Sequence, residues 1–484
     1  MADSLKIVLV EPGSEFAETG CDILSKQTPS LGLVSIATYL NKHGFSARVF
    51  DQQVGHRGKD PFPTFLKAFS PQVVGIQAYS YNLETAYQTA KLVRSIIPST
   101  RILLGGVHPS VQPYETLQGC TEVDVVVIGE GEETLLEYCQ SILDKTNIPI
   151  PGIINRDDNQ FVLRPFIENL DFLPFPDWGI LNYTMYHKAY SEGFQKMETL
   201  VPISSSRGCG QGCSYCVTGW LGNKIRMRSP ESVVQEIVQN YDKGFRFFYF
   251  TDPNFLFNKN RVERICDLLH ETIFTQRRGR IYWKCQSRAC FADQKLFRKM
   301  RMNGCELIFF GIESGNDEVL RQNKPNQTRE MVINGVLAAR QAGLKVRGSF
   351  ILGLPFDTKQ SMEETLQFSQ DLQLDGSTFH VLDIYPGTGL SKLLQKSPHW
   401  GGLTILEGGK FSRGTSQVQV NDATSEDIEE IRSRAIYQNF KQDASRIRKN
   451  LTELRYYLDH DKNTFQRILK DRMREISLPC KEGI

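Results

Sequence analysis

Residues 204–216 read SSSRGCGQGCSYC and place three cysteines, Cys209, Cys213 and Cys216, within eight residues. Zinc is one candidate, but a structural zinc site normally has four ligands, and this loop offers no second pair. A [4Fe–4S] cluster is normally held by four thiolates, so three of them leave one iron open to a small molecule. The glycines between the cysteines allow the backbone to wrap around such a centre. We therefore expect these cysteines to hold metal, and unliganded core thiols are the alternative.

Outward from the loop, strand and helix patterns alternate through residues 201–390. Six apolar runs are separated by stretches with helical periodicity. The runs are LVPISSS, FRFFYFTDPNF, RIYWKCQSRA, CELIFFGIESG, KVRGSFILGLP and STFHVLDIYPGTG. Six such units predict a partial β/α barrel, two units short of a closed one, with its functional residues at the carboxyl ends of the strands. The cysteine loop then lies at the mouth of this barrel, directly after its first strand.

Residues 1–150 show the same alternation with five apolar strands, which predicts a doubly wound α/β domain of the flavodoxin-like or Rossmann-like type. Such sheets bind ligands beyond the carboxyl ends of their strands. Six residues stand at those ends: Ser80, Gly105, Gly106, His108, Gly129 and Gly131. Tight turns explain these glycines equally well. No G-x-G-x-x-G follows the first strand, which argues against a dinucleotide.

Two further segments complete the chain. Residues 151–200 predict a linker with a β-hairpin turned at 157–159 and a proline-broken crossing segment. Residues 391–484 predict a helical region, which contains a capping box at Thr424 and Asp427 and a long amphipathic helix after it. The basic face of that helix is best explained as solvated, with a carrier protein or a phosphorylated substrate as the alternative.

The composition excludes several classes of protein. The chain of 484 residues is 40% hydrophobic and 23% charged, and its net charge of +2 offers no argument for nucleic acid or an anionic membrane. No apolar run approaches the roughly 18 residues of a membrane span, and the N-terminal run is too short for a secretory signal. We expect a cytoplasmic protein whose 11 cysteines are thiols or metal ligands.

The loop, with Tyr215 before its last cysteine, resembles the signature of the radical S-adenosylmethionine enzymes, and the six units match their partial barrel. Other stretches resemble motifs of the branch that carries an N-terminal cobalamin-binding domain: SLGLVSIATYL, LLGGVHP, VVIGEGE, FFGIESG, GSFILGLP and YPGTGL. The similarity spans residues 5–390, about four-fifths of the chain. The chain is thus similar to the class B methyltransferases among these enzymes.

The resemblance implies roles for the residues at the barrel mouth. The three cysteines would hold a [4Fe–4S] cluster whose open iron chelates the amino and carboxylate groups of S-adenosylmethionine. Other residues would surround that molecule: Tyr215, Gly348 and Gly353 beside the adenine, Glu313 at the ribose, Asp252 and Asn254 near the amino group, and Arg288 at the carboxylate.

Each of these assignments has a plainer alternative. Residues 252–254 form a good turn sequence, Glu313 is placed to cap the next helix, and Arg288 can pair with a neighbouring acid. Cys285 and Cys290, five residues apart, are expected to pack in the core and not to hold a second cluster.

For the first domain the resemblance implies cobalamin across the strand ends, with Ser80, Gly105, Gly106, His108 and Gly129 at the site. Many cobalamin domains place a histidine from a D-x-H-x-x-G loop below the cobalt. The corresponding loop here, EPGSEFAETG, contains no histidine. We therefore expect cobalamin without a protein histidine below the cobalt, and we expect His108, before a proline, to serve a turn.

The implied function is methyl transfer from methylcobalamin to an unactivated carbon of a biosynthetic intermediate. One S-adenosylmethionine would remethylate the cobalt, and a second would generate the radical. The alternative is an enzyme of the same fold that catalyses a radical rearrangement, cyclisation or dehydration without net methylation. An iron–sulfur sensor or electron carrier is a third class. The implied partners are a small-molecule substrate and an electron donor such as flavodoxin or ferredoxin, with no nucleic acid.

Overall fold

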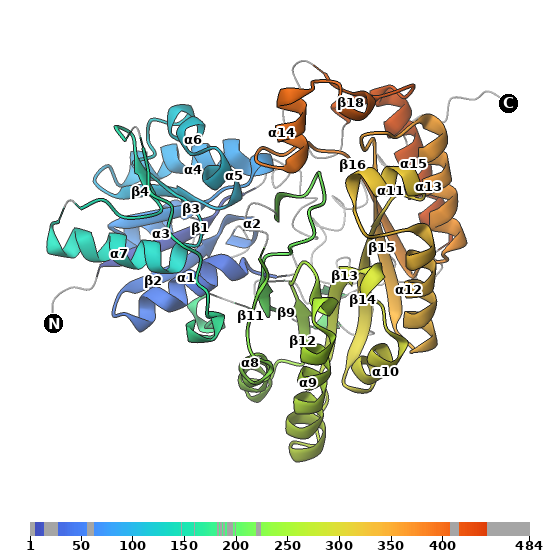
Figure 1. Ribbon diagram of the computed structural model, residues 1–484. Coiled ribbons are helices and arrows are strands. Elements are labelled where there is room, and N and C mark those ends of the chain that lie inside the picture. Colours follow the sequence, from blue (N-terminus) through green and yellow to red (C-terminus); the bar gives the residue numbers. More distant parts are fainter. Residues whose placement is uncertain are drawn as a thin grey trace, which may run out of the picture.

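The computed structural model describes residues 5–13, 28–55, 62–146, 148–158, 160–181, 183, 186, 189–190, 197–198, 200–218, 224–406 and 416–442. Two lobes lie side by side, each built on one six-stranded sheet (Figure 1). The blue N-terminal lobe stands at the left of the view, and the green-to-orange barrel stands at the right. No helix in this part of the chain is both long and apolar enough to cross a membrane.

The N-terminal sheet has the strand order β2-β1-β3-β4-β5-β6. The first five strands along the chain are parallel and confirm the predicted doubly wound sheet; they are β1 (Lys6–Glu11), β2 (Ser46–Asp51), β3 (Val73–Gln77), β4 (Arg101–Gly105) and β5 (Val125–Val127). Neighbouring side chains on a strand point to opposite faces, so Leu9 and Val8 belong to separate core clusters.

Helices cover both faces of this sheet. On the face of Leu9 lie α1 (Leu31–Lys42) and α7 (Gly131–Asp144). On the face of Val8 lie α3 (Phe62–Phe69), α4 (Leu83–Ile96) and α6 (Pro113–Gly119). The remaining short elements are α2 (Gln52–Gly55), η2 (Ser80–Asn82) and α5 (Val107–Val111).

The hairpin predicted in the linker, before the crossing segment, pairs differently in the structure. The chain does turn at 155–158, where the Asn155 backbone N–H donates to Asp158 Oδ2 at 2.7 Å. However, β6 (Ile153–Asn155) pairs antiparallel with β5 and becomes the sixth strand of the first sheet. Residues 160–165 do not form the expected second strand, and Val162 and Leu163 are exposed there. Pairing with the buried strand β5 instead places the apolar side chains of β6 in the core. The segment continues with η3 (Leu170–Phe172), η4 (Trp178–Ile180), β7 (Ala189–Tyr190) and β8 (Met197–Glu198).

Six parallel strands form the second sheet in sequential order and confirm the predicted partial barrel. They are β9 (Leu200–Ile203), β12 (Phe247–Phe250), β13 (Tyr282–Arg288), β14 (Cys305–Glu313), β15 (Lys345–Leu352) and β16 (Gly376–Val381). On β13, Trp283 and Cys285 are buried, whereas Lys284 and Gln286 on the other face are half-buried. This alternation is typical of a sheet with one face under helices and one facing a partly open interior.

The helices of the barrel alternate with its strands. They are α8 (Pro230–Asp242), α9 (Lys259–Leu269), α10 (Gln294–Met302), α11 (Asp317–Asn323), α12 (Arg329–Gln341) and α13 (Lys359–Asp371). The π-helical η8 (His270–Gln276) continues α9, and η7 (Phe255–Phe257) and η9 (Ala289–Phe291) are short 3-10 helices. The predicted N-cap of α8 is confirmed, because Ser229 Oγ accepts from the Ser232 backbone N–H at 3.1 Å.

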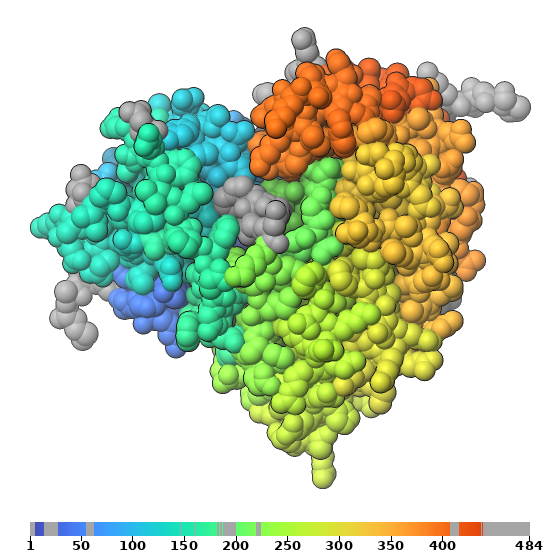
Figure 2. Space-filling view, in the orientation of Figure 1, coloured from blue at the N-terminus to red at the C-terminus, as the bar shows by residue number. Residues whose placement is uncertain are grey.

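The C-terminal section packs on the barrel and also reaches the first lobe. Its α15 (Ser425–Gln442) lies on β16 and α13, and the predicted capping box is present, with the Asp427 N–H donating to Thr424 Oγ1 at 3.2 Å. The predicted continuation of this helix lies outside the described residues. Sequence analysis missed the antiparallel pair β17 (Leu403–Ile405) and β18 (Val418–Val420), which follows α14 (Gly389–Lys396) and η10 (Trp400–Gly402). Figure 2 shows this orange section against both lobes, and a Cβ on Gly387 would lie 2.8 Å from Val111.

Candidate active site between the two lobes

The cysteine loop leaves the barrel after β9 and is closed at its neck by a short hairpin. The hairpin strands are β10 (Ser206–Arg207) and β11 (Arg226–Met227). Gly208, Gly210 and Gly212 have φ angles of +86°, +67° and +68°. Such left-handed backbone is accessible to glycine without strain, so the local sequence permits the tight path of the loop.

The three cysteines of the loop are free, partly exposed thiols. Burial raises the pKa of Cys209 to about 11, and it raises the pKa of Cys213 as well. Among the described residues, no three His, Cys, Asp or Glu side chains are grouped closely enough to hold a single metal ion. Three thiols with no fourth protein ligand in the loop suit a [4Fe–4S] cluster better than a structural zinc ion, which normally has four protein ligands.

The loop is anchored to the barrel through Ser214. Its backbone N–H and its hydroxyl donate to Asn323, to the carbonyl oxygen at 3.0 Å and to Oδ1 at 2.8 Å. Its carbonyl accepts from the Leu390 N–H at 2.7 Å. Tyr215 packs against the hydrophobic core, and burial together with Glu313 raises the pKa of its hydroxyl well above the usual range. The role of Tyr215 beside the adenine stays a prediction.

Arg288, at the end of β13, contacts the loop directly. Its Nη1 donates to Gln211 Oε1 at 3.1 Å and lies 3.9 Å from Cys213 Sγ, and its other terminal nitrogen donates to the Pro325 carbonyl. Its Nε is buried and has no hydrogen-bond partner. All these partners are neutral or thiol groups, so within the described residues the ordinary ion pair considered for Arg288 is not formed.

Glu313, at the end of β14, forms a buried ion pair. Lys324 Nζ donates to its Oε1 at 2.8 Å, and the two side chains are only 5% and 10% exposed. The adjoining Gly311 leaves the room for this pair, since a Cβ there would lie 2.5 Å from Glu313 Oε1. The helix-cap alternative for Glu313 is wrong, because Asn316 caps α11. Sequence analysis missed Lys324, which carries no local signal of its own.

Asp252 and Asn254 follow β12 and are both buried. Asp252 accepts from the Ser205 N–H at 3.1 Å, from the Ser205 hydroxyl at 2.7 Å and from the Ser206 hydroxyl. Asn254 Oδ1 accepts from the Ser287 hydroxyl at 2.5 Å and from the Arg288 N–H at 3.3 Å, while its Nδ2 has no partner. These residues therefore do more than form a turn, and Asp252 supports the start of the cysteine loop.

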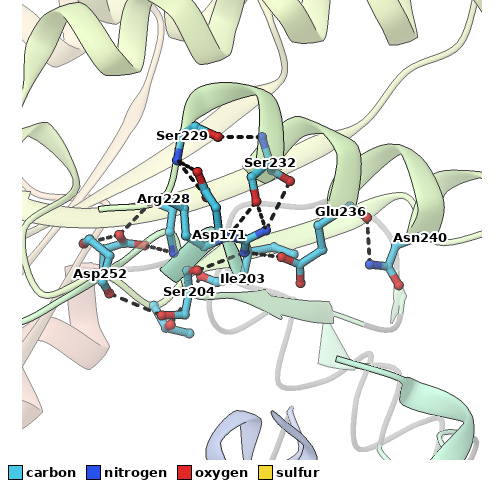
Figure 3. Close-up of polar contacts among 12 residues, drawn as sticks. Asp171, Ile203, Ser204, Arg228, Ser229, Ser232, Glu236, Asn240 and Asp252 are labelled. Atoms are coloured by element: carbon cyan, nitrogen blue, oxygen red, sulfur yellow. Dashed lines mark hydrogen bonds and ion pairs between the residues drawn. The ribbon is translucent and has the colours of Figure 1, made fainter. Parts of the chain in front are cut away.

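A second support of the same segment appears in Figure 3. Arg228 Nη1 donates to the Ser204 carbonyl at 3.1 Å and forms an ion pair with the fully buried Glu236. The Arg228 backbone N–H also donates to the Ser205 carbonyl at 3.0 Å. Burial raises the pKa of Glu236, and the nearby arginine opposes this rise. Nothing in the sequence pattern distinguished these two residues from other charged residues of the barrel.

The two glycines expected beside the adenine face apolar side chains. A Cβ on Gly348 would lie 2.6 Å from Ile312 and 2.8 Å from Leu374. Gly353 has a φ of +80°, and its Cβ would lie 3.1 Å from Ile428 of α15. Close packing therefore accounts for both glycines, and their place beside the adenine stays a prediction.

The first lobe carries a cavity of about 390 Å³ at the carboxyl ends of its strands. Its apolar floor consists of Leu9, Gly75, Leu103 and Val127, and α1 and α7 supply Ile36 and Leu135. Four of the six residues predicted at the strand ends, Gly105, Gly106, Gly129 and Gly131, line it. A Cβ on Gly129 would meet no atom within 4 Å, so this glycine faces open space. Three charged residues, Glu130, Glu132 and Arg207, also line the cavity.

Ser80 and His108 are not among the residues that line this cavity. Instead they bind each other, with Ser80 Oγ at 2.9 Å from His108 Nδ1. Burial lowers the pKa of His108. Ser80 begins η2, after β3, whereas His108 lies in α5, after β4, and not in the expected turn. A direct role of either residue in cofactor binding stays a prediction.

Two family models match the chain. The radical SAM superfamily matches residues 203–369, and the B12 binding domain matches residues 24–138. An uncharacterized methyltransferase of Pyrococcus horikoshii is 29% identical over 80% of this chain and 82% of that protein. An anaerobic magnesium-protoporphyrin IX monomethyl ester cyclase of Cereibacter sphaeroides is 25% identical over 81% of this chain and 64% of that protein.

A solved structure has the same fold over nearly the whole chain. It is that of OxsB, a cobalamin-dependent S-adenosylmethionine radical enzyme, with aqua-cobalamin and S-adenosylmethionine bound. The TM-score is 0.72 at 18% identity, and the match covers 98% of this chain and 76% of that one. The two family models fall on the two lobes in the order that the sheets predict. The protein is therefore a radical SAM enzyme with an N-terminal B12-binding domain.

Proposed function

We propose that this enzyme is a cobalamin-dependent methyltransferase that acts on an unactivated carbon of a small biosynthetic intermediate. One observation carries the proposal. The cavity of the first lobe is lined on one side by Gly105 and Gly129 and on the other by Arg207 and Gly208, which lead directly into Cys209. The cavity thus reaches the residues that lead into the cysteine loop, which supports a site where two cofactors are held near each other and near a substrate.

The enzyme's cofactors are a [4Fe–4S] cluster, S-adenosylmethionine and cobalamin. Cys209, Cys213 and Cys216 would hold the cluster, and the glycine-walled cavity would hold part of cobalamin. When bound, the cluster and S-adenosylmethionine supply radical chemistry, and cobalamin supplies a carrier for a methyl group. The contribution of the protein is to bind these groups, orient them and exclude water.

Two buried donors suit the carboxylate of S-adenosylmethionine. Asn254 Nδ2 and Arg288 Nε both lack a partner, and the two residues are joined by the bond from the Arg288 N–H to Asn254 Oδ1. A carboxylate satisfies both donors, and hydrogen bonds to a charged acceptor are the strong ones. We therefore assign both residues to the carboxylate, which for Asn254 replaces the amino group expected from the resemblance. We assign Glu313 to the ribose, with Lys324 holding its carboxylate in place.

The proposal is tested without knowing the substrate. Anaerobically reduced protein, loaded with iron, sulfide and hydroxocobalamin, is incubated with methyl-deuterated S-adenosylmethionine. We expect 5′-deoxyadenosine in solution and a trideuterated methyl group on the cobalamin, both detected by mass spectrometry. Formation of 5′-deoxyadenosine without a labelled methyl group on cobalamin would contradict methyl transfer. Absence of both products would favour an iron–sulfur sensor or electron carrier.

A radical cyclisation without net methylation is the second candidate. It is favoured by the similarity to the ester cyclase of Cereibacter sphaeroides, although this chain spans 64% of that protein. The same labelling experiment separates the two candidates, because a cyclisation leaves no label on cobalamin or on the product.

We further propose a cytoplasmic location and an electron donor such as flavodoxin or ferredoxin. All cysteines in the described ranges are free thiols, as is usual in a reducing compartment. A small single-electron carrier is the class of protein that reduces such a cluster. Cluster reduction by flavodoxin plus its reductase, followed as the loss of visible absorbance, tests this part.

A further inference from the structure

Two arginines face each other across the neck of the cysteine loop. In the β10–β11 hairpin, Arg207 is paired with Arg226, so two like charges stand directly opposite each other. Directly opposed like charges destabilise an antiparallel pair. Arg226 is also almost completely buried, with a side-chain exposure of 3%. The neck therefore needs an anion from outside the hairpin.

That anion is Glu130, which belongs to the other lobe. Its Oε1 accepts from Arg207 Nη1 and from Arg226 Nη2, both at 2.9 Å. Its Oε2 accepts from Arg226 Nη1 at 2.9 Å and from the Ile167 N–H at 2.8 Å. Although burial acts in the opposite direction, the two arginines hold the pKa of Glu130 below its usual range. One carboxylate thus binds both strands of the neck.

A second acid completes the arrangement. Glu132 Oε1 accepts from Arg207 Nη2 at 2.5 Å, and the Glu132 side chain is 4% exposed. Glu130 and Glu132 lie at the turn from β5 into α7, next to Gly129 and Gly131. Two buried acids of the first lobe therefore balance two arginines of the barrel lobe.

The same residues line the cavity of the first lobe. Glu130, Glu132, Arg207 and Gly208 all form part of its wall. A ligand in the cavity therefore touches the groups that position the neck of the loop. Because Gly208 directly precedes Cys209, a change at Arg207 reaches the first cysteine within two residues.

We infer that the first lobe positions the cysteine loop through Glu130 and Arg207, and that filling the cavity orders the loop. Glu130, Glu132 and Arg207 are positioning residues in this scheme, since they act through the loop. The coupling is reciprocal, so an ordered loop also favours a filled cavity. The inference rests on the proposed function only for the identity of the ligand, cobalamin.

Hydrogen exchange measured by mass spectrometry on the iron-free full-length protein tests the coupling. The readout is the exchange of the amides of residues 208–218, with and without hydroxocobalamin. In the wild type we expect hydroxocobalamin to slow this exchange by roughly five-fold or more, the lower end of the usual coupling between linked sites. We expect Glu130→Gln and Arg207→Lys to exchange faster without ligand and to lose the ligand-dependent protection. Because both residues line the cavity and the coupling is reciprocal, their uptake should be weaker, so hydroxocobalamin is raised until each variant is saturated by absorbance.

Arg207→Lys keeps the positive charge but loses the guanidinium group that donates to two carboxylates at once. This variant therefore still tests the coupling if Glu130→Gln does not fold. The matched control is Glu168→Gln, which breaks the exposed ion pair of Glu168 with Lys224 near the same hairpin and should leave the protection unchanged.

Uptake of hydroxocobalamin by the wild type without protection of residues 208–218 overturns the coupling alone. Protection that persists in both variants overturns it too. Protection in the wild type without methyl transfer upholds the coupling and rejects the proposed function, whereas absence of uptake rejects both.

Discussion

The cavity of the first lobe and the mouth of the barrel occupy the same place in their sheets, beyond the carboxyl ends of parallel strands, yet they are built differently. The floor of the cavity consists of apolar residues and glycine, such as Leu103 and Gly75. The barrel mouth instead contains buried ion pairs, among them Glu313 with Lys324 and Arg228 with Glu236. The apolar floor of the cavity is therefore defined by shape, although Glu130, Glu132 and Arg207 also line the cavity. The barrel mouth is defined by charges that neutralise each other.

This difference predicts two kinds of mutational effect. A change at the apolar floor or at the glycines of the cavity alters space and leaves the rest of the fold intact. A change at the mouth leaves a charge without its partner in a buried place, which is among the larger costs a protein can meet. The four predictions below test this contrast, and they run from the largest expected effect to the smallest.

Cys213→Ala should have the largest effect. Two thiolates do not hold the proposed cluster, so iron after anaerobic reconstitution should fall from about four atoms per chain to near zero. Formation of 5′-deoxyadenosine should become undetectable. Cys290→Ala is the control, because Cys290 is a free, partly exposed thiol outside the loop. Full iron content in Cys213→Ala would contradict the assignment of this cysteine.

Lys324→Met removes one partner of a buried pair at the barrel mouth. Glu313 is then left charged and buried, so the free energy of unfolding should fall by about 3–5 kcal/mol, measured by urea denaturation. Arg321→Met is the matched control. It breaks an exposed pair with Glu318, whose members are 68% and 52% exposed, and should cost less than about 1 kcal/mol. Equal effects of the two variants would show that burial of the pair does not matter.

Asp357, in the loop after β15, makes stability depend on pH. It is fully buried, and burial raises its pKa to about 7. Between the unfolded pKa near 4 and the folded pKa, the unfolded chain loses the proton while the folded protein keeps it, so stability falls as pH rises.

Asp357→Asn removes this contribution to the pH dependence of stability. From pH 5 to pH 7 the free energy of unfolding of the wild type should fall, relative to that of the variant, by about 2–3 kcal/mol. Denaturation curves of both proteins at the two pH values measure the difference. A constant difference between them would mean that Asp357 ionises in the folded protein as readily as in the unfolded chain.

Gly105→Val tests the cavity. A Cβ at Gly105 would lie 3.5 Å from Val127, an ordinary contact, so the change in the free energy of unfolding should stay below about 1 kcal/mol. The added methyl groups occupy the cavity, and uptake of hydroxocobalamin should weaken at least about ten-fold, which corresponds to about 1.4 kcal/mol. Undiminished uptake by the folded variant would place cobalamin elsewhere.

Much of the architecture follows from sequence patterns. The six barrel strands and the five parallel strands of the first sheet were predicted, because buried parallel strands are continuous apolar runs. The pairing of β6 was not, since a three-residue strand can join any open edge. The antiparallel pair of β17 and β18 was missed for the same reason: its strands are too short to show a period.

By itself, the sequence determined the features that short stretches of chain define. These are the three cysteines at spacings of four and three, the glycines between them, and the glycines at the strand ends. Only the tertiary structure decided which charges meet. Glu130 lies 77 residues from Arg207 and 96 residues from Arg226, and Lys324 reaches back to Glu313 around a turn. Spacing along the chain carries no information about such pairs, because they form only where the fold brings distant strand ends together and excludes the water that would otherwise solvate each charge.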